Sequence, residues 1–203
     1  MPETSTARAI VLDPRPLFGN AVRAYLNKGG HTMLSQVLNL EQTLEQIGLH
    51  QPNLVIIGPH LADSSLAICR EINQRWKHIK LIIFTAHAND LLFQADAAYV
   101  GVAACLTPDA TDEECLNLIE QVMDGQEFFS REIVALGAQP IDLSTKELQV
   151  LKLLSEGKTD REIAQKLGVQ VSTIHSHAQH ILEKLNVHTR QQAVMRARSR
   201  GLI

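Results

Sequence analysis

No apolar run in this 203-residue sequence is long enough to cross a membrane, and no secretory leader is recognisable at its N-terminus. A membrane-spanning helix needs about 18 to 20 consecutive apolar residues, whereas the mean hydropathy here is −0.04. The first residues, MPETSTARA, lack the apolar core of a signal peptide. The sequence therefore predicts a soluble, cytoplasmic protein with no membrane partner.

The sequence also lacks paired cysteine motifs. Its three cysteines, Cys69, Cys105 and Cys115, are an odd number, and no two of them have CxxC spacing. This pattern argues against a disulfide framework and against a zinc knuckle, so we expect buried free thiols. Redox sensing by Cys105 is a weaker alternative, because the apolar neighbours of this residue favour an inert thiol.

Acidic and basic residues are distributed unevenly along the chain, whose overall formal charge is −3. Residues 1–140 contain 9 Lys and Arg against 16 Asp and Glu, a net charge of −7, whereas residues 141–203 contain 10 against 6, a net charge of +4. A basic C-terminal part joined to an acidic N-terminal part indicates that the C-terminal part binds a polyanion.

Short apolar runs alternate with longer amphipathic segments in residues 7–125, a pattern typical of a parallel sheet with helical crossovers. The predicted strands are 9–12, 32–38, 53–58, 80–85 and 102–106, and the predicted helices are 17–28, 40–49, 65–76, 89–100 and 112–124. These elements predict an α/β domain with a doubly wound, five-stranded parallel sheet. In such a domain the functional site lies beyond the carboxyl ends of the strands, here near Asp13, Gly58 and Thr85.

Residues 126–140 are expected to link a first domain of residues 1–125 to a second domain of residues 141–203, and a short helix is expected over 131–136. The second domain contains three hydroxyl residues that are each followed three positions later by Glu or Gln, which is the spacing of a helix capping box. These pairs are Ser144 with Glu147, Thr159 with Glu162, and Thr189 with Gln192. We predict an all-α domain with four helices, over 145–156, 160–167, 171–185 and 190–200, and with Gly157 and Gly168 ending the first two.

The segment TDREIAQKLGVQVSTIHSHAQHILEKL, from Thr159 to Leu185, contains a short helix, a turn at Gly168 and a longer helix. This is the pattern of a helix-turn-helix, whose second helix enters the major groove of DNA. The stretch that surrounds it, residues 143–194, resembles the LuxR-type DNA-binding domain. The matching residues are Glu147, Glu162, Ile163, Ala164, Thr173, His177, Ile181, Lys184, Leu185 and Arg190.

The resemblance implies that helix 171–185 binds promoter DNA and that helix 190–200 is available for dimerisation. Cationic and hydroxyl side chains supply phosphate contacts, and polar side chains on the exposed face of a recognition helix contact the bases. We assign base contacts to His175, Ser176 and Gln179, and further DNA contacts to Thr159, Arg161, Ser172, Thr173, Lys184 and Arg190. Members of the family commonly have lysine at positions 175 and 179, so we expect a changed base preference, with Gln179 suited to adenine.

Two other interpretations of this segment carry less weight. A helix-turn-helix pattern can serve the packing of a helical domain without contacting DNA. The histidines 175, 177 and 180 suggest a metal cluster. However, His175 and His177 are two residues apart and would point about 200° apart on a helix, and no cysteine or carboxylate is present at ligand spacing. We therefore expect no metal site and no cofactor.

Residues 7–125 resemble the receiver domain that NarL/FixJ-type response regulators join to a LuxR-type domain. In a receiver, carboxylates after the first and third strands bind Mg²⁺ and accept a phosphoryl group, and a lysine balances the charge. Here Asp13 is retained, whereas Pro14 replaces the second acid, Gly58 replaces the phosphoryl acceptor and Pro108 replaces the lysine. Thr85, the hydroxyl that would respond to the phosphoryl group, is also retained.

These replacements predict a degenerate receiver pocket that cannot be phosphorylated in the usual way. Its residues are Asp13, Pro14, Gly58, Thr85 and Pro108. Asp63, in the loop after the third strand, is a weaker candidate for a substitute acceptor. The domain is expected to form a homodimer through apolar faces around 17–26 and 115–122. Binding of a small molecule or a partner protein in the vacated pocket is a second hypothesis.

The sequence thus predicts a NarL/FixJ-type transcription regulator that binds duplex DNA as a dimer, acts without aspartyl phosphorylation and is not an enzyme. The alternative is a protein-interaction adaptor or a ligand-binding regulator with weak selectivity for DNA. Salt-dependent, sequence-selective binding to duplex DNA separates the two hypotheses, because an adaptor should show neither property.

Overall fold

The computed structural model describes residues 6–61 and 64–203. The chain forms two compact units, Met1–Ala138 and Gln139–Ile203. In the part of the chain that the structure describes, no helix has the length and apolar character needed to cross a membrane.

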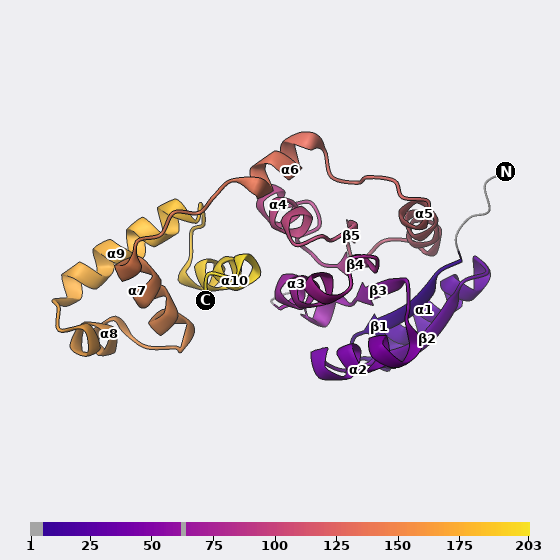
Figure 1. The fold of residues 1–203 in the computed structure, drawn as a ribbon, viewed down its shortest axis with the longest axis horizontal. Coiled ribbons are helices and arrows are strands. Elements are labelled where there is room, and N and C mark those ends of the chain that lie inside the picture. Colours follow the sequence, from indigo (N-terminus) through magenta and orange to yellow (C-terminus); the bar gives the residue numbers. More distant parts are fainter. Residues whose placement is uncertain (1–5, 62–63) are drawn as a thin grey trace. The chain divides into compact units, whose positions relative to one another are not determined.

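The first unit is built on a five-stranded parallel sheet with the order β2-β1-β3-β4-β5 (Figure 1). This order confirms the predicted doubly wound sheet, and the predicted strands differ from the observed ones by one or two residues at their ends. The strands are β1 (Arg8–Leu12), β2 (Thr32–Val37), β3 (Leu54–Ile57), β4 (Lys80–Phe84) and β5 (Ala104–Leu106). The helices are α1 (Pro16–Lys28), α2 (Leu40–His50), α3 (Ser65–Arg75), α4 (Leu91–Tyr99), α5 (Asp112–Met123) and α6 (Arg131–Ala138), with a 3₁₀ turn, η1, at Pro59–Leu61.

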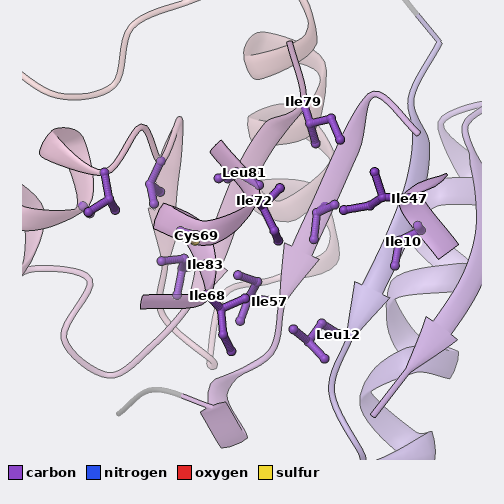
Figure 2. Close-up of a cluster of buried hydrophobic side chains, with 14 of the residues drawn as sticks. Ile10, Leu12, Ile47, Ile57, Ile68, Cys69, Ile72, Ile79, Leu81 and Ile83 are labelled. Carbon is purple, nitrogen blue, oxygen red and sulfur yellow. The ribbon is translucent and has the colours of Figure 1, made fainter. Parts of the chain in front are cut away.

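Both faces of the sheet are buried. Successive side chains of a strand point to opposite faces, so each strand contributes to both cores. In β1, Ile10 and Leu12 belong to one core cluster and Ala9 and Val11 to the other. Figure 2 shows the first cluster, in which side chains of β1, β3 and β4 pack against side chains of α2 and α3. The second cluster joins the sheet to α1 and α5. The carboxyl ends of β1 and β3 are thereby held side by side, next to Asp13 and Gly58.

The apolar faces of α1 and α5 lie in the core of the first unit. Val22 and Leu26 of α1 and Ile119 and Val122 of α5 are buried against the sheet. The argument that these faces pair two chains is therefore wrong for these residues. Leu17, at the start of α1, is 82% exposed and remains accessible, and Phe18 and Leu118 are only partly buried.

The cysteines are free, as expected, and Cys69 and Cys115 are buried, whereas Cys105 is only partly buried. Burial raises the pKa of the Cys105 thiol to about 12, and burial raises the pKa of Cys115 to about 11. Because the thiolate is the reactive form of cysteine, these values argue against the redox-sensing alternative.

Helix α6 packs against α4 and belongs to the first unit. The two helices approach so closely that a Cβ built on Gly137 would lie 2.2 Å from the carbonyl oxygen of Ala95. The second unit begins at Gln139, and Ile141 already packs against its core. The expected short helix over 131–136 is present as residues 131–138. This helix packs on α4 within the first unit, so the stretch 126–140 is not a free linker.

The second unit consists of α7 (Thr145–Ser155), α8 (Asp160–Leu167), α9 (Val171–Lys184) and α10 (Arg190–Arg200). The three predicted capping boxes are present at the starts of α7, α8 and α10. Gly168 ends α8 in the left-handed conformation, with φ 66°, which a glycine adopts without steric cost. Ile163 of α8 and Ile174 and Ile181 of α9 pack into one buried cluster, so the predicted helix-turn-helix has its own core.

Candidate nucleic-acid interface and receiver pocket

Helix α9 has a buried face and an exposed face, as the recognition helix of a helix-turn-helix requires. Ile174, Ala178 and Ile181 are buried. The three predicted base-contacting residues, His175, Ser176 and Gln179, are all exposed. The exposed face is also polar, so it offers hydrogen-bond donors and acceptors to the base edges of a DNA groove.

The other predicted DNA contacts lie around this face. Ser172 and Thr173 are exposed in the first turn of α9, and Arg161 is exposed in the first turn of α8. Thr159 caps α8: its Oγ1 accepts a hydrogen bond from the Glu162 backbone N–H, at 3.4 Å. Its hydroxyl therefore already has a structural role at the start of the helix-turn-helix.

Lys184, at the end of α9, is bound to a buried acid. Its Nζ donates to Oε2 of Glu147 at 2.8 Å, and the Glu147 side chain is 5% exposed. Burial alone would raise the pKa of Glu147, but hydrogen bonds from Lys184 and Ser144 lower it to about 2. The pair fixes the end of α9 on the start of α7, and Lys184 remains 42% exposed toward solvent.

Asp160, in the first turn of α8, brings together two of the predicted DNA-contacting residues. Arg190, at the start of α10, donates from Nη2 to Asp160 Oδ2 at 2.8 Å and from Nη1 to Oδ1. His175 Nε2 lies 2.7 Å from Asp160 Oδ2. The hydrogen bond from Arg190 lowers the pKa of Asp160. Sequence reasoning missed Asp160, although an acid within a cationic segment that was predicted to contact DNA was a usable signal.

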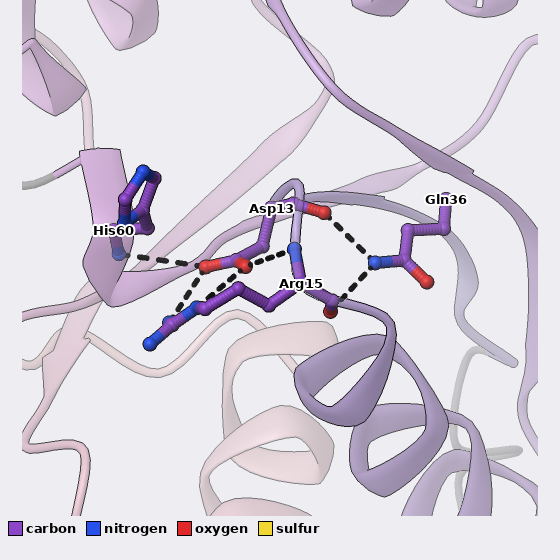
Figure 3. A network of polar contacts seen from close by, with 4 residues as sticks. All are labelled: Asp13, Arg15, Gln36 and His60. Carbon is purple, nitrogen blue, oxygen red and sulfur yellow. Dashed lines mark hydrogen bonds and ion pairs between the residues drawn. The ribbon is translucent and has the colours of Figure 1, made fainter.

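The receiver pocket contains an ion pair where a receiver would bind its metal ion (Figure 3). The carboxylate of Asp13, at the end of β1, is fully buried. Arg15 Nε and Nη2 donate to its two oxygens, each at 2.9 Å, and the Arg15 backbone N–H donates to Oδ1 at 2.8 Å. A longer bond, 3.4 Å, comes from the backbone N–H of His60. Burial acts to raise the pKa of Asp13, but these bonds and the charge of Arg15 hold it below the usual value.

The backbone around this ion pair is also held by side chains. Gln36, on β2, donates from Nε2 to the carbonyl oxygens of Asp13 and Arg15 at 2.8 and 2.9 Å (Figure 3). Gly19 of α1 makes room for Gln36, since a Cβ at position 19 would lie 1.9 Å from Gln36 Oε1. The loop between β1 and α1 is therefore fixed in the conformation that places Arg15 over Asp13.

Gly58 directly follows β3 and lies against Asp13. A Cβ built on Gly58 would lie 2.1 Å from Asp13 Oδ2, far closer than two such atoms can approach. The space that the sequence suggested was vacated by the missing acceptor is occupied by the carboxylate of Asp13. The pocket therefore contains the Asp13–Arg15 ion pair in place of open space.

The remaining pocket residues are also placed by the structure. Thr85 is fully buried after β4, and its Oγ1 accepts a hydrogen bond from the His87 backbone N–H at 3.1 Å. Pro14 is partly buried between Asp13 and Arg15, and Pro108 is exposed in the turn after β5. Asp63, the weaker candidate acceptor, lies outside the described residues.

No group of three or more His, Cys, Asp or Glu side chains within residues 6–61 and 64–203 is arranged to hold a metal ion. On α9, His175 and His180 are exposed, whereas His177 is partly buried. None of these histidines belongs to a group of three possible metal ligands among the described residues.

The fold and the two sites together define a class of protein: a receiver-like α/β domain joined to a helix-turn-helix DNA-binding domain. Comparison with known proteins agrees with this class. Residues 142–197 match the family described as bacterial regulatory proteins of the luxR family. The transcriptional regulatory protein DesR of Bacillus subtilis is 31% identical over 183 residues, which cover 83% of this chain and 90% of DesR.

The similarity extends to other regulators and to solved structures. The oxygen regulatory protein NreC of Staphylococcus carnosus is 24% identical over 203 residues, covering 85% of this chain and 93% of NreC. A structure of the two-component response regulator RcsB with DNA covers 96% of this chain and 99% of its own, with a TM-score of 0.67 and 17% identity, and shows the same fold. The chain belongs to the NarL/FixJ family of response regulators, which are transcription regulators with a LuxR-type DNA-binding domain.

Proposed function

We propose that this protein regulates transcription by binding specific promoter sequences as a homodimer, and that it does so without aspartyl phosphorylation. The observation that carries the second part is the position of Asp13 Oδ2, which lies 2.1 Å from where a Cβ of residue 58 would be. A receiver with this arrangement has neither an acceptor carboxylate at that position nor the space for one.

Loss of the acceptor is accompanied by loss of the metal site. Transfer of a phosphoryl group needs a divalent cation with oxygen ligands to neutralise the developing charge. Here the retained carboxylate, Asp13, is already neutralised by the guanidinium of Arg15, and Pro14 supplies no ligand. The ion pair therefore supports a domain that holds one conformation instead of switching with a phosphoryl group.

Sequence-specific DNA binding is supported by the exposed polar face of α9 and by the net charge of +4 over residues 141–203, where 10 Lys and Arg oppose 6 Asp and Glu. Cations supply affinity for phosphates, and exposed polar side chains of the recognition helix distinguish the base pairs. Gln179 donates to Glu183 Oε1 at 3.2 Å in the unbound protein, so DNA has to replace this bond.

Dimerisation would match two helix-turn-helix units to an inverted repeat, because half-site spacing follows the symmetry of the protein. A solved structure with the same fold is described as two RcsB dimers bound to two parallel DNAs. The expectation for this chain is a dimer with one α9 in each half-site.

The test is a selection of genomic DNA fragments by the purified full-length protein, without any phosphodonor, beside the unit 139–203 alone. Enrichment of an inverted repeat by the full-length protein is the expected result. If only the isolated unit 139–203 enriches a repeat and the full-length protein does not, the first unit blocks DNA binding until another signal arrives. Selection by neither protein would overturn the proposal and favour a protein-interaction adaptor.

A further inference from the structure

Asp160 connects the three helices that surround the DNA-facing side of the second unit. It lies in the first turn of α8, and its carboxylate contacts His175 on α9 and Arg190 on α10. The Asp160 side chain is 14% exposed, whereas that of His175 is 62% exposed. An almost buried acid therefore holds one edge of an imidazole that is otherwise open to solvent.

The chemistry of this contact determines which ring nitrogen of His175 carries a hydrogen. An ionised carboxylate only accepts hydrogen bonds, and the paired guanidinium of Arg190 keeps the pKa of Asp160 below its usual value. The nitrogen at 2.7 Å from Oδ2 is Nε2, so Nε2 must be the donor. In neutral imidazole only one nitrogen carries a hydrogen, and the partner of that nitrogen fixes the tautomer. Nδ1 is then left as a hydrogen-bond acceptor.

We propose that Asp160 is a positioning residue for base recognition: by holding His175 through Nε2, it presents Nδ1 to the major groove as an acceptor. This inference rests on the proposed DNA binding through α9. An acceptor at this position pairs with the amino group of adenine N6 or cytosine N4, and it is repelled by guanine, which offers only the acceptors N7 and O6. A lysine at position 175 would do the opposite, because an ammonium only donates and favours guanine.

The experiment is a selection of bound sequences from randomised duplexes by the full-length protein at about pH 8.5. Four variants accompany the wild type: His175→Ala, His175→Lys, Asp160→Asn and Arg190→Gln. The base position that His175 contacts is defined as the position at which His175→Ala loses its preference. Arg190→Gln is the matched control, because it removes the other partner of Asp160 and leaves the His175 contact in place.

The wild type should select adenine or cytosine at the defined position, and His175→Lys should change this preference to guanine. Asp160→Asn should reduce the preference about fivefold or more, as expected when one base-specific hydrogen bond is lost. An amide both donates and accepts hydrogen bonds, so it can hold either tautomer of His175. Arg190→Gln should weaken binding at all sequences without changing the preference. If Asp160 had a purely structural role, Asp160→Asn would instead weaken binding at all sequences without changing the preference, as Arg190→Gln does.

Selection of guanine by the wild type, or an unchanged preference in Asp160→Asn, would overturn the inference while leaving DNA binding intact. Absence of any selection by the wild type would overturn the proposed function as well. A second measurement does not depend on the folding of any variant. The nitrogen–proton correlation spectrum of His175 in the wild type should show the hydrogen on Nε2, and a hydrogen on Nδ1 would contradict the inference.

Discussion

The carboxylate of Asp13 occupies the space that a side chain at position 58 would need, with Oδ2 2.1 Å from the position of a Cβ on Gly58. The absence of a side chain at position 58 and the position of the Asp13 carboxylate are therefore a single structural feature. Arg15 completes it by pairing with both carboxylate oxygens. Restoring one residue of an ordinary receiver would not restore its pocket.

Substitution of Gly58 should therefore destabilise the first unit without restoring phosphorylation. Gly58→Ala should lower its free energy of unfolding by about 1 to 3 kcal/mol, as overpacking of a buried site does. Gly58→Asp should lower it at least as much, because it adds a second carboxylate beside Asp13. Urea denaturation followed by the fluorescence of Trp76, the single tryptophan, measures both. Gly58→Asp incubated with a small phosphodonor and Mg²⁺ should form no acid-stable, alkali-labile phosphate.

Gly48→Ala is the matched control, since a Cβ at that position would meet no neighbouring atom within 4 Å and Gly48 lies in the last turn of α2. It should stabilise the protein slightly, by at most about 0.5 to 1 kcal/mol, which is the gain from replacing a glycine in the middle of a helix. Equal stability of Gly58→Ala and Gly48→Ala would show that Asp13 can move away from position 58.

Removal of the Arg15 guanidinium should leave the buried Asp13 carboxylate without its cation. Arg15→Gln should lower the free energy of unfolding by about 1 to 3 kcal/mol at neutral pH, the cost of an unsatisfied buried polar group. The loss should be smaller in Asp13→Asn/Arg15→Gln, because no charge remains to be buried. Urea denaturation of the wild type, both single variants and the double variant gives the coupling energy. A coupling energy of zero would contradict the assigned ion pair.

The Glu147–Lys184 pair should make the second unit sensitive to acid. The pKa of Glu147 is lowered to about 2 in the folded protein, below its usual value, so the folded state favours the ionised form. The stabilisation is therefore fully present above the usual pKa of glutamate and is lost as the pH falls toward 2. Glu147→Gln should remove about 2 kcal/mol at neutral pH, a value discounted because Lys184 is partly exposed.

Hydrogen exchange of α7 and α9 measures this effect, because the single tryptophan lies in the first unit. Protection of these helices in the wild type should decrease between about pH 4.5 and pH 2. Glu147→Gln should start with lower protection and lose less of it over the same range. An identical pH dependence in the two proteins would assign the acid sensitivity to another group.

Substitution of Gly137 should detach α6 from α4. A Cβ at this position would lie 2.2 Å from the carbonyl oxygen of Ala95, and a backbone atom cannot move aside as a flexible side chain does. Gly137→Val should expose residues 131–138 to limited proteolysis and to rapid hydrogen exchange. Val134→Ala, at a half-exposed position of the same helix, is the control and should leave the cleavage pattern unchanged. Unchanged protection in Gly137→Val would show that α6 is held elsewhere.

The sequence predicted most of the fold because the signals that set it are local. The pairs Ser144–Glu147, Thr159–Glu162 and Thr189–Gln192 each start a helix with side chains three residues apart. The box formed by Thr111 and Glu114 at α5 has the same spacing and was overlooked. Contacts between distant segments could not be predicted in this way, and α6 was assigned to a linker because its partner, α4, lies more than thirty residues earlier in the chain.

The features of the candidate sites also differ in whether they follow from local sequence or from contacts between segments. Replacement of the acceptor by Gly58 is visible in the sequence, and so is the exposed face of α9, because both follow from position within an element. The pairing of Arg15 with Asp13 depends on the conformation of the loop after β1, which Gln36 holds from another strand. The contact of Asp160 with His175 joins two helices through a turn. Neither contact is indicated by the sequence spacing of the two residues that form it.

The central claim is that DNA binding does not depend on a phosphoryl group, and its most direct test is the dissociation constant of the full-length protein for its selected repeat. The constant is measured with and without beryllofluoride and Mg²⁺, which together mimic a phosphorylated aspartate. The account predicts that the two constants agree within about twofold, or less than 0.5 kcal/mol. Tightening of binding by about tenfold or more on addition of beryllofluoride would show that the pocket still senses a phosphoryl group, and would contradict the account.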